Sequence, residues 1–181
     1  MFDFLFKRKP ANPEPAVKAP PAAARAPETG VAPGTQLHFD ASLVTALVSD
    51  HRYLLAMFKE IAEATTRRDN GVVSRALAQF GDALRGHILK ENIRLYVYLK
   101  HSLQGDEDST AIMHQFSREM HHIGLAVTDF LTRYTGDRSW DDAQWSVFER
   151  DLKEVGAVLT RRIETEESIL YPLYLPPGDY A

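Results

Sequence analysis

The sequence contains no cysteine among its 181 residues, which excludes a disulfide framework, a zinc finger, an iron-sulfur cluster and a cysteine nucleophile. It also lacks an excess of basic charge, because the formal net charge is -4, and this does not favour a nucleic-acid-binding surface. No stretch stays free of charge for the about 18 residues that a membrane helix needs. Alternating strand patterns are absent as well. Any metal in this chain must therefore be held by His, Asp and Glu.

Proline is scarce outside the first part of the chain. Seven of the 10 prolines lie between residues 10 and 33, in a tract that is otherwise rich in alanine. Because proline removes a backbone donor and breaks helices, we expect residues 10–36 to form an extended, disordered linker. The chain as a whole is 44% hydrophobic and 25% charged, which is typical of a folded protein. We assign the folded domain to residues 37–175 and a short tail to 176–181.

Residues 1–9 combine aromatic and cationic side chains. The charges follow the apolar residues, whereas a secretory signal would have them first. Two interpretations remain open: an unstructured start of the chain, or a tether whose aromatics enter a membrane interface or a partner groove while its cations meet anionic groups. The tether would consist of Phe2, Phe4, Phe6, Lys7, Arg8 and Lys9.

Four long segments after the linker repeat apolar residues with helical spacing. We expect Asp40 or Ser42 to cap the first helix, turns rich in Gly and Asp to separate the helices, and Pro172 to end the last one. Four amphipathic helices joined by short turns predict an all-α, up-down-up-down four-helix bundle. The predicted helices cover about residues 42–66, 72–102, 109–134 and 141–171.

Five polar residues fall on the apolar stripes of these helices, where an unpaired charge is costly. The two on the second helix are one turn apart, as are the two on the fourth, so each pair projects from one helix face. Because the second and fourth helices run parallel in this topology, the pairs should lie at similar heights as two halves of one site. The five residues are His51, His87, Glu91, Arg162 and Glu166.

These positions resemble the motifs of the hemerythrin-like family, the HHE cation-binding proteins, over about residues 41–173. The motifs that carry the resemblance are Asp50-His51, His87-Ile88 with Glu91-Asn92, Arg162-Ile163 with Glu166-Glu167, and Leu170-Tyr171-Pro172. The resemblance implies a bundle that holds non-haem iron, often as a di-iron centre. The family has further histidines on its third and fourth helices, and at the matching positions this chain has Met120 and Arg162.

The other histidines are expected to lie off the apolar stripes. His121 and His122 follow Met120 directly, but at 100° per residue both project away from its stripe. Glu167 and Glu119 would reach the site only if a helix rotated slightly. The remaining histidines outside the stripes are His38, His101 and His114.

Two functions follow from these residues. Arg162 is never a metal ligand while protonated, and its charge would oppose a nearby cation by several kcal/mol, about 4 for each unit of cation charge at 4 Å. We favour a bundle in which Arg162 pairs with Glu91 or Glu166 and a core salt-bridge network replaces the metal. The protein would then be a non-catalytic binding or regulatory module. The alternative is a mono- or di-iron protein, or one that binds another divalent cation, responding to metal or oxygen through His51, His87, Glu91 and Glu166.

A second resemblance, to the bacterial regulator of sigma D family, is carried by Gly86-His87 and by Arg162-Ile163 with Glu166-Glu167. It implies only that a bundle of this kind can bind a protein without a metal. We therefore expect a protein partner and no nucleic acid. No nucleophile-base pair or phosphate-binding glycine loop occurs, so we expect no enzymatic activity. We expect a cytoplasmic protein, with peripheral membrane contact through residues 1–9 as an alternative.

Overall fold

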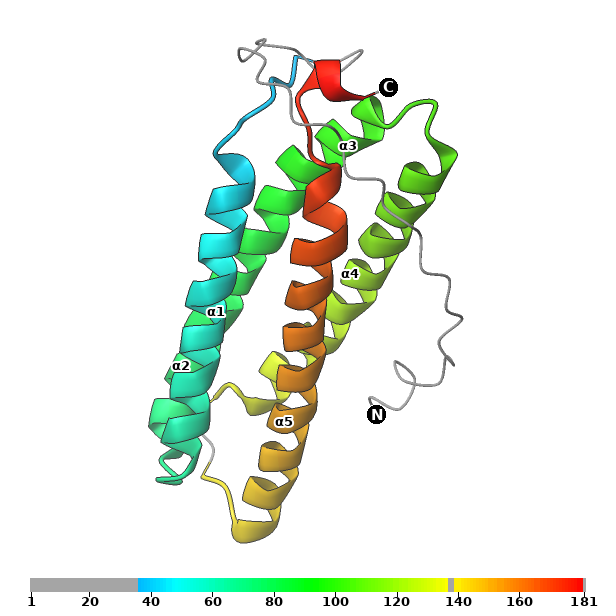
Figure 1. Ribbon diagram of the computed structural model, residues 1–181. Coiled ribbons are helices and arrows are strands. Elements are labelled where there is room, and N and C mark those ends of the chain that lie inside the picture. Colours follow the sequence, from blue (N-terminus) through cyan, green and yellow to red (C-terminus); the bar gives the residue numbers. More distant parts are fainter. Residues whose placement is uncertain (1–35, 137–138, 181) are drawn as a thin grey trace.

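The computed structural model describes residues 36–136 and 139–180 (Figure 1). The N-terminal motif of residues 1–9 and all but the last residue of the predicted linker lie outside the described residues, so both remain predictions. The elements in chain order are α1 (Leu43–Thr65), α2 (Asn70–Lys90), η1 (Glu91–Tyr96), α3 (Val97–Ser102), α4 (Glu107–Tyr134), α5 (Asp142–Thr165), η2 (Glu166–Leu170), η3 (Tyr171–Leu173) and η4 (Pro177–Asp179).

These elements form four helical columns side by side (Figure 1). α2, η1 and α3 are consecutive and make one column, and α5, η2 and η3 make another. Helix α1 packs against α2 and α5, and α4 packs against the same two, so α2 and α5 are diagonal to one another. The predicted all-α four-helix bundle is confirmed. Among the described residues, no helix is long and apolar enough to cross a membrane.

Side-chain caps fix where three of the helices begin. The carboxylate of Asp69 accepts a hydrogen bond from the backbone N–H of Val72 at 3.0 Å at the start of α2. Asp106 caps α4 in the same way. Asp141 begins α5 with a capping box that it shares with Gln144. Because each cap satisfies a backbone donor that the helix leaves free, the turns separate the helices at defined positions.

The apolar core consists of two clusters at opposite ends of the bundle. The larger includes Phe80, Phe130 and Phe148, and the smaller includes Leu47 and Tyr98. Each of these five side chains is 2% exposed or less. The buried polar residues described below fall between the clusters along the helices, since His51 on α1 is flanked by Leu47 of one cluster and Leu54 of the other. The bundle is therefore interrupted by a polar layer.

Gly156 lets α5 approach α1 closely. A Cβ added at Gly156 would lie 2.6 Å from Cε1 of Phe58, and the Phe58 ring is packed edge-on against Phe80. We expect Gly156→Ala to lower the free energy of unfolding by about 1–3 kcal/mol, because the core would be overpacked. Urea denaturation of the full chain measures this change.

A matched substitution at Gly86 should act in the opposite direction. A Cβ added there meets no atom within 4 Å. Alanine is a better helix former than glycine, so Gly86→Ala should raise the free energy of unfolding by up to about 1 kcal/mol. If Gly156→Ala and Gly86→Ala lowered the free energy of unfolding by similar amounts, contact with Phe58 would not be the cause of the loss in Gly156→Ala.

Candidate metal centre

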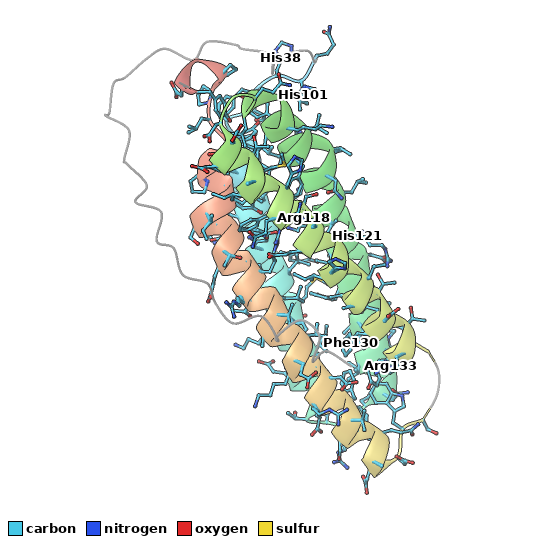
Figure 2. All side chains as sticks on the ribbon, turned by 90° about the vertical axis from the view of Figure 1, so that its right-hand side faces the viewer. His38, His101, Arg118, His121, Phe130 and Arg133 are labelled. Atoms are coloured by element: carbon cyan, nitrogen blue, oxygen red, sulfur yellow. The ribbon has the colours of Figure 1, made fainter. Side chains whose placement is uncertain are left out.

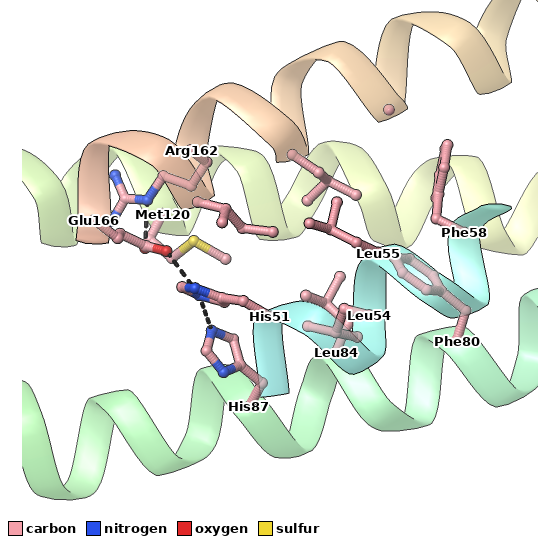
Figure 3. A pocket seen from close by; sticks show the side chains of 13 residues that line it. His51, Leu54, Leu55, Phe58, Phe80, Leu84, His87, Met120, Arg162 and Glu166 are labelled. Atoms are coloured by element: carbon pink, nitrogen blue, oxygen red, sulfur yellow. Dashed lines mark hydrogen bonds and ion pairs between the residues drawn. The ribbon is translucent and has the colours of Figure 1, made fainter. Parts of the chain in front are cut away.

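The five polar residues predicted to face inward lie together in one buried layer. Their side chains come from three columns and each is 5% exposed or less. His51 extends from α1 and His87 from α2, while Arg162 comes from the last turn of α5 and Glu166 begins η2 (Figure 3). Glu91 is fully buried at the start of η1. Helical phase therefore predicted the burial of all five of these residues.

Three of the four predicted ligands converge on a common point. Nε2 of His51 lies 3.1 Å from Nε2 of His87 and 3.3 Å from Oε2 of Glu166. One ligand atom from each of the three residues lies within 4.8 Å of the others. Glu91 is adjacent, with Oε2 3.9 Å from Nε2 of His87. That Glu91 oxygen is buried and has no hydrogen-bond partner among the described residues.

The outer nitrogen of each histidine is held by a carboxylate. Nδ1 of His51 lies 2.8 Å from Oε1 of Glu167. Nδ1 of His87 lies 3.5 Å from Oδ2 of Asp50, which also accepts a hydrogen bond from Nζ of Lys90 at 2.5 Å. A carboxylate at Nδ1 orients an imidazole so that Nε2 is available as a ligand. Glu167 thus contacts the back of His51 and does not point at the centre.

The role of Asp50 was missed by the sequence analysis. Asp50 immediately precedes His51 in the chain, yet its carboxylate contacts the other histidine, His87, on the neighbouring helix. A one-residue step turns a side chain by 100°, so Asp50 faces α2 while His51 faces the core. The adjacent Asp-His pair, together with the predicted packing of the first two helices, was the signal that could have found it.

The two imidazoles differ in their ionisation. Burial lowers the pKa of His51, but hydrogen bonds to Glu166 and Glu167 outweigh burial and leave that pKa raised. Burial, with the charge of His51 added, lowers the pKa of His87 to about 4. His87 is therefore neutral near pH 7 and can offer a lone pair.

The two buried carboxyl groups also differ. Burial, followed by repulsion from Glu166, raises the pKa of Glu91. Burial acts on Glu166 in the same direction, but hydrogen bonds from His51 and Arg162 outweigh it, so the pKa of Glu166 is lowered. Glu166 is the carboxylate that stays ionised, and Glu91 is the one that retains a proton more readily.

Arg162 points away from the two histidines. Its Nε donates to Oε1 of Glu166 at 2.5 Å, and one Nη donates to the hydroxyl of Tyr96 at 3.0 Å and to the backbone carbonyl of Phe116 at 3.1 Å. Figure 3 shows Glu166 between the guanidinium and His51. No ion pair joins Arg162 to Glu91 within the described part of the chain, and Oε1 of Glu91 instead accepts a hydrogen bond from the Tyr171 hydroxyl at 3.0 Å.

Both carboxylates stand at the start of a π-helical turn, which the sequence analysis did not predict. η1 begins at Glu91 and η2 at Glu166. A π turn holds one residue more than an α-helical turn, so the residue five positions after the carboxylate returns to the same face of the helix. In both columns that fifth residue is a buried tyrosine. The matching sets are His87, Glu91 and Tyr96 on one column, and Arg162, Glu166 and Tyr171 on the other.

A small cavity lies beside the histidine pair. Its volume is about 30 Å³, room for about two water molecules. Met120, which the sequence motifs predict to occupy a former ligand position, is 6% exposed and lines this cavity. The cavity extends along an apolar wall toward Phe58 and Gly156. The polar layer therefore has space for a ligand on its apolar side.

The other histidines lie away from the centre, as helical phase predicts. His121, His122 and His114 on α4 are exposed. His38 and His101 lie at one end of the bundle, and Figure 2 shows them far along the molecule from His121. Glu119, named as a reserve ligand, is 51% exposed and lies 3.5 Å from an Nη of Arg162.

Comparison with known families decides what this arrangement belongs to. The family model for the hemerythrin HHE cation binding domain matches residues 42–174. The chain belongs to the hemerythrin HHE family. Neither the curated proteins nor the solved structures gave a match to this chain.

As a hemerythrin HHE domain, this protein has a divided polar layer. One side holds His51 and His87 with their Nε2 atoms facing Glu166. On the other side, the guanidinium of Arg162 binds the opposite oxygen of Glu166. The histidine side of the layer, which could bind a cation, and the guanidinium of Arg162 thus share one carboxylate, that of Glu166.

Proposed function

We propose that this hemerythrin-like protein binds a single transition-metal ion through His51, His87 and Glu166, and that it serves as a metal-responsive binding module rather than an enzyme. The observation that carries the proposal is the convergence of two imidazole Nε2 atoms and one carboxylate oxygen, with each imidazole oriented from behind by a carboxylate.

The spacing of the three ligand atoms supports this proposal. Two ligands bound at about 2.0–2.2 Å to one ion, with about 90–110° between them, lie about 2.9–3.5 Å apart. The distances from Nε2 of His51 to Nε2 of His87 and to Oε2 of Glu166 are 3.1 Å and 3.3 Å. With both Nδ1 atoms on carboxylates, neutral imidazoles would direct their Nε2 lone pairs at each other. A shared cation, or a proton on His51, removes that repulsion.

The charge of the layer favours one ion rather than two. Glu91 and Glu166 bring two carboxyl groups, and Arg162 already neutralises one charge through its bond to Glu166. The guanidinium occupies the side where a second ion would have to bind, and a second divalent ion there would be repelled. Arg162 is therefore better described as a replacement for a second metal ion than as a barrier to the first.

A bound ion of the iron type would supply redox chemistry. Asp50 and Glu167 would hold the imidazoles in position, and Phe58 is among the apolar residues that line the cavity beside them. Two imidazoles with one carboxylate suit iron, manganese and zinc alike.

Metal analysis of the full chain tests this proposal. After loading with ferrous iron and gel filtration, we expect one ion per chain in the natural protein. His51→Ala and His87→Ala should each lower the affinity by more than the about 10–100-fold that loss of an orienting carboxylate costs. His121→Ala is the matched control, because that histidine is exposed, and it should bind as the natural protein does. Absence of metal from the natural protein would overturn the proposal.

A second candidate function is a metal-free module that binds a protein partner. The ion pair between Arg162 and Glu166, with 4% and 2% exposure, supports it because Glu166 is neutralised without any metal. In that case the imidazolium of His51, whose pKa is raised, would take the cation's place between the carboxylates. The same iron-loading experiment separates the two functions. Contact with a partner or a membrane through residues 1–9 would be compatible with either function.

A further inference from the structure

Tyr171 places a phenolic oxygen at the edge of the centre. The side chain is 3% exposed and follows η2, where Pro172 fixes the backbone of the final turn. Its ring stacks on the His51 ring, with centroids 5.6 Å apart and an interplanar angle of 12°. The tyrosine is therefore held as firmly as the histidines.

The phenolic oxygen contacts one of the proposed ligands, His51, and also Glu91. It lies 3.1 Å from Nε2 of His51 and donates its proton to Oε1 of Glu91 at 3.0 Å. The distance to His51 equals the one between the two imidazole Nε2 atoms, 3.1 Å, and falls in the range for two ligands of one ion. Since the proton points to Glu91, the oxygen keeps lone pairs for the centre.

We propose that Tyr171 is the fourth protein ligand of this centre and binds a ferric ion as a phenolate, with Glu91 as the acceptor of its proton. This inference rests on the proposed single-ion site. Glu91 first releases its own proton to solvent. The O–H bond of Tyr171 then breaks, the proton moves along the existing hydrogen bond to Oε1 of the Glu91 carboxylate, and the oxygen electron pair forms the bond to the cation, so that one proton leaves the layer. No electron is transferred in this step.

The polar layer is divided between the two histidines and Arg162, and this division explains why the site would use the oxygen of Tyr171 as a ligand. Arg162 removes one imidazole from the ligand set that the family's motif implies, and Met120 removes another. A phenolate adds an anionic, hard donor in their place, which suits a ferric ion. Glu91, fully buried and partnered by the Tyr171 hydroxyl, is then needed as a proton carrier and not as a ligand.

Tyr96 provides a matched control within the same layer. It is the last residue of η1, five residues after Glu91 as Tyr171 is five residues after Glu166, and it is 7% exposed. Its hydroxyl accepts a hydrogen bond from Arg162. Tyr171→Phe and Tyr96→Phe therefore remove the same atom from the same kind of buried site. Only the first removes an oxygen that faces His51.

The experiment is ferric loading of the full chain, followed by visible absorption and by resonance Raman spectroscopy excited in the absorption band. We expect a phenolate-to-ferric charge-transfer band with tyrosinate ring vibrations in the natural protein and in Tyr96→Phe. Tyr171→Phe should lose the band and the vibrations while it still binds iron, with an affinity lowered at least tenfold.

The possible failures are distinguishable. If the natural protein binds one ferric ion without a tyrosinate signature, or if Tyr171→Phe keeps the signature, Tyr171 is not a ligand while the single-ion site stands. If the natural protein binds no iron, the single-ion site itself is refuted. Circular dichroism of both variants establishes that each has kept the helical fold.

Discussion

Glu166→Ala is expected to lower the free energy of unfolding by about 3–5 kcal/mol and to abolish metal binding. The stability loss arises because Arg162 would remain buried at 4% exposure without its nearest carboxylate. The loss of binding arises because Glu166 is the only carboxylate among the three converging ligands. Urea denaturation and iron analysis of the same preparation measure the two effects.

A double variant separates the two roles of Glu166. Replacing both partners with apolar residues, as Arg162→Met with Glu166→Leu, removes the buried charge together with its counterion, and such replacements are often neutral or stabilising. The double variant should therefore recover most of the lost stability and still bind no metal. If it is as unstable as Glu166→Ala, the cost does not come from the unpaired guanidinium.

Arg162→His combined with Met120→His is expected to raise metal affinity and to add a second bound ion. Arg162 blocks one side of Glu166 with a positive charge, and Met120 lines the cavity and is predicted to occupy a former ligand position. Two imidazoles in their place would give a second cation the donors that it lacks. Iron analysis per chain, with an absorbance scan for an oxo-bridged di-iron band, measures the outcome.

The control for this gain is Arg162→Lys, which keeps the positive charge and removes the planar guanidinium. It should leave the number of bound ions unchanged. Flat affinity in the double histidine variant would mean that Arg162 and Met120 do not occupy former ligand positions. A second ion in Arg162→Lys would instead show that the shape of the guanidinium, and not its charge, excludes the ion.

The fold and the inward-facing residues could be predicted because both depend on helical phase. Apolar spacing placed His51, His87 and Glu166 on buried stripes, and the structure finds each of them buried. The antiparallel order of short-turn helices set the second and fourth columns parallel, which brought their polar residues to one height. Periodicity carries this information because burial follows a fixed angle for each residue.

Helical phase could not predict a change in the number of residues per helical turn. The π turns at Glu91 and Glu166 alter the register after each carboxylate, so a constant 100° step does not explain how Tyr96 and Tyr171 come to share a face with them. One sequence signal is that tyrosine follows glutamate at the same distance, five residues, in both columns. A comparison of those two segments with each other would have identified Tyr171 as a member of the site.

Contacts between neighbouring helices were also beyond the sequence. The expectation that Arg162 would pair with Glu91 or Glu166 did not distinguish between them, and in the structure Arg162 pairs with Glu166 while the Tyr171 hydroxyl donates to Glu91. Likewise, Asp50 was read only as part of a motif because its contact with His87 depends on the rotation of α1 against α2. Helical phase indicates which residues face inward but not which of them touch.

The polar layer between the two apolar clusters also fixes the axial register of the bundle. Sliding any one of the three columns that supply the layer by a helical turn, about 5.4 Å, would carry a buried carboxylate, imidazole or guanidinium into an apolar cluster and separate it from its partners. Such a shift would cost several kcal/mol, whereas the apolar residues alone would tolerate it more easily, since their stripes repeat every turn. The layer thus selects one axial alignment of these three columns.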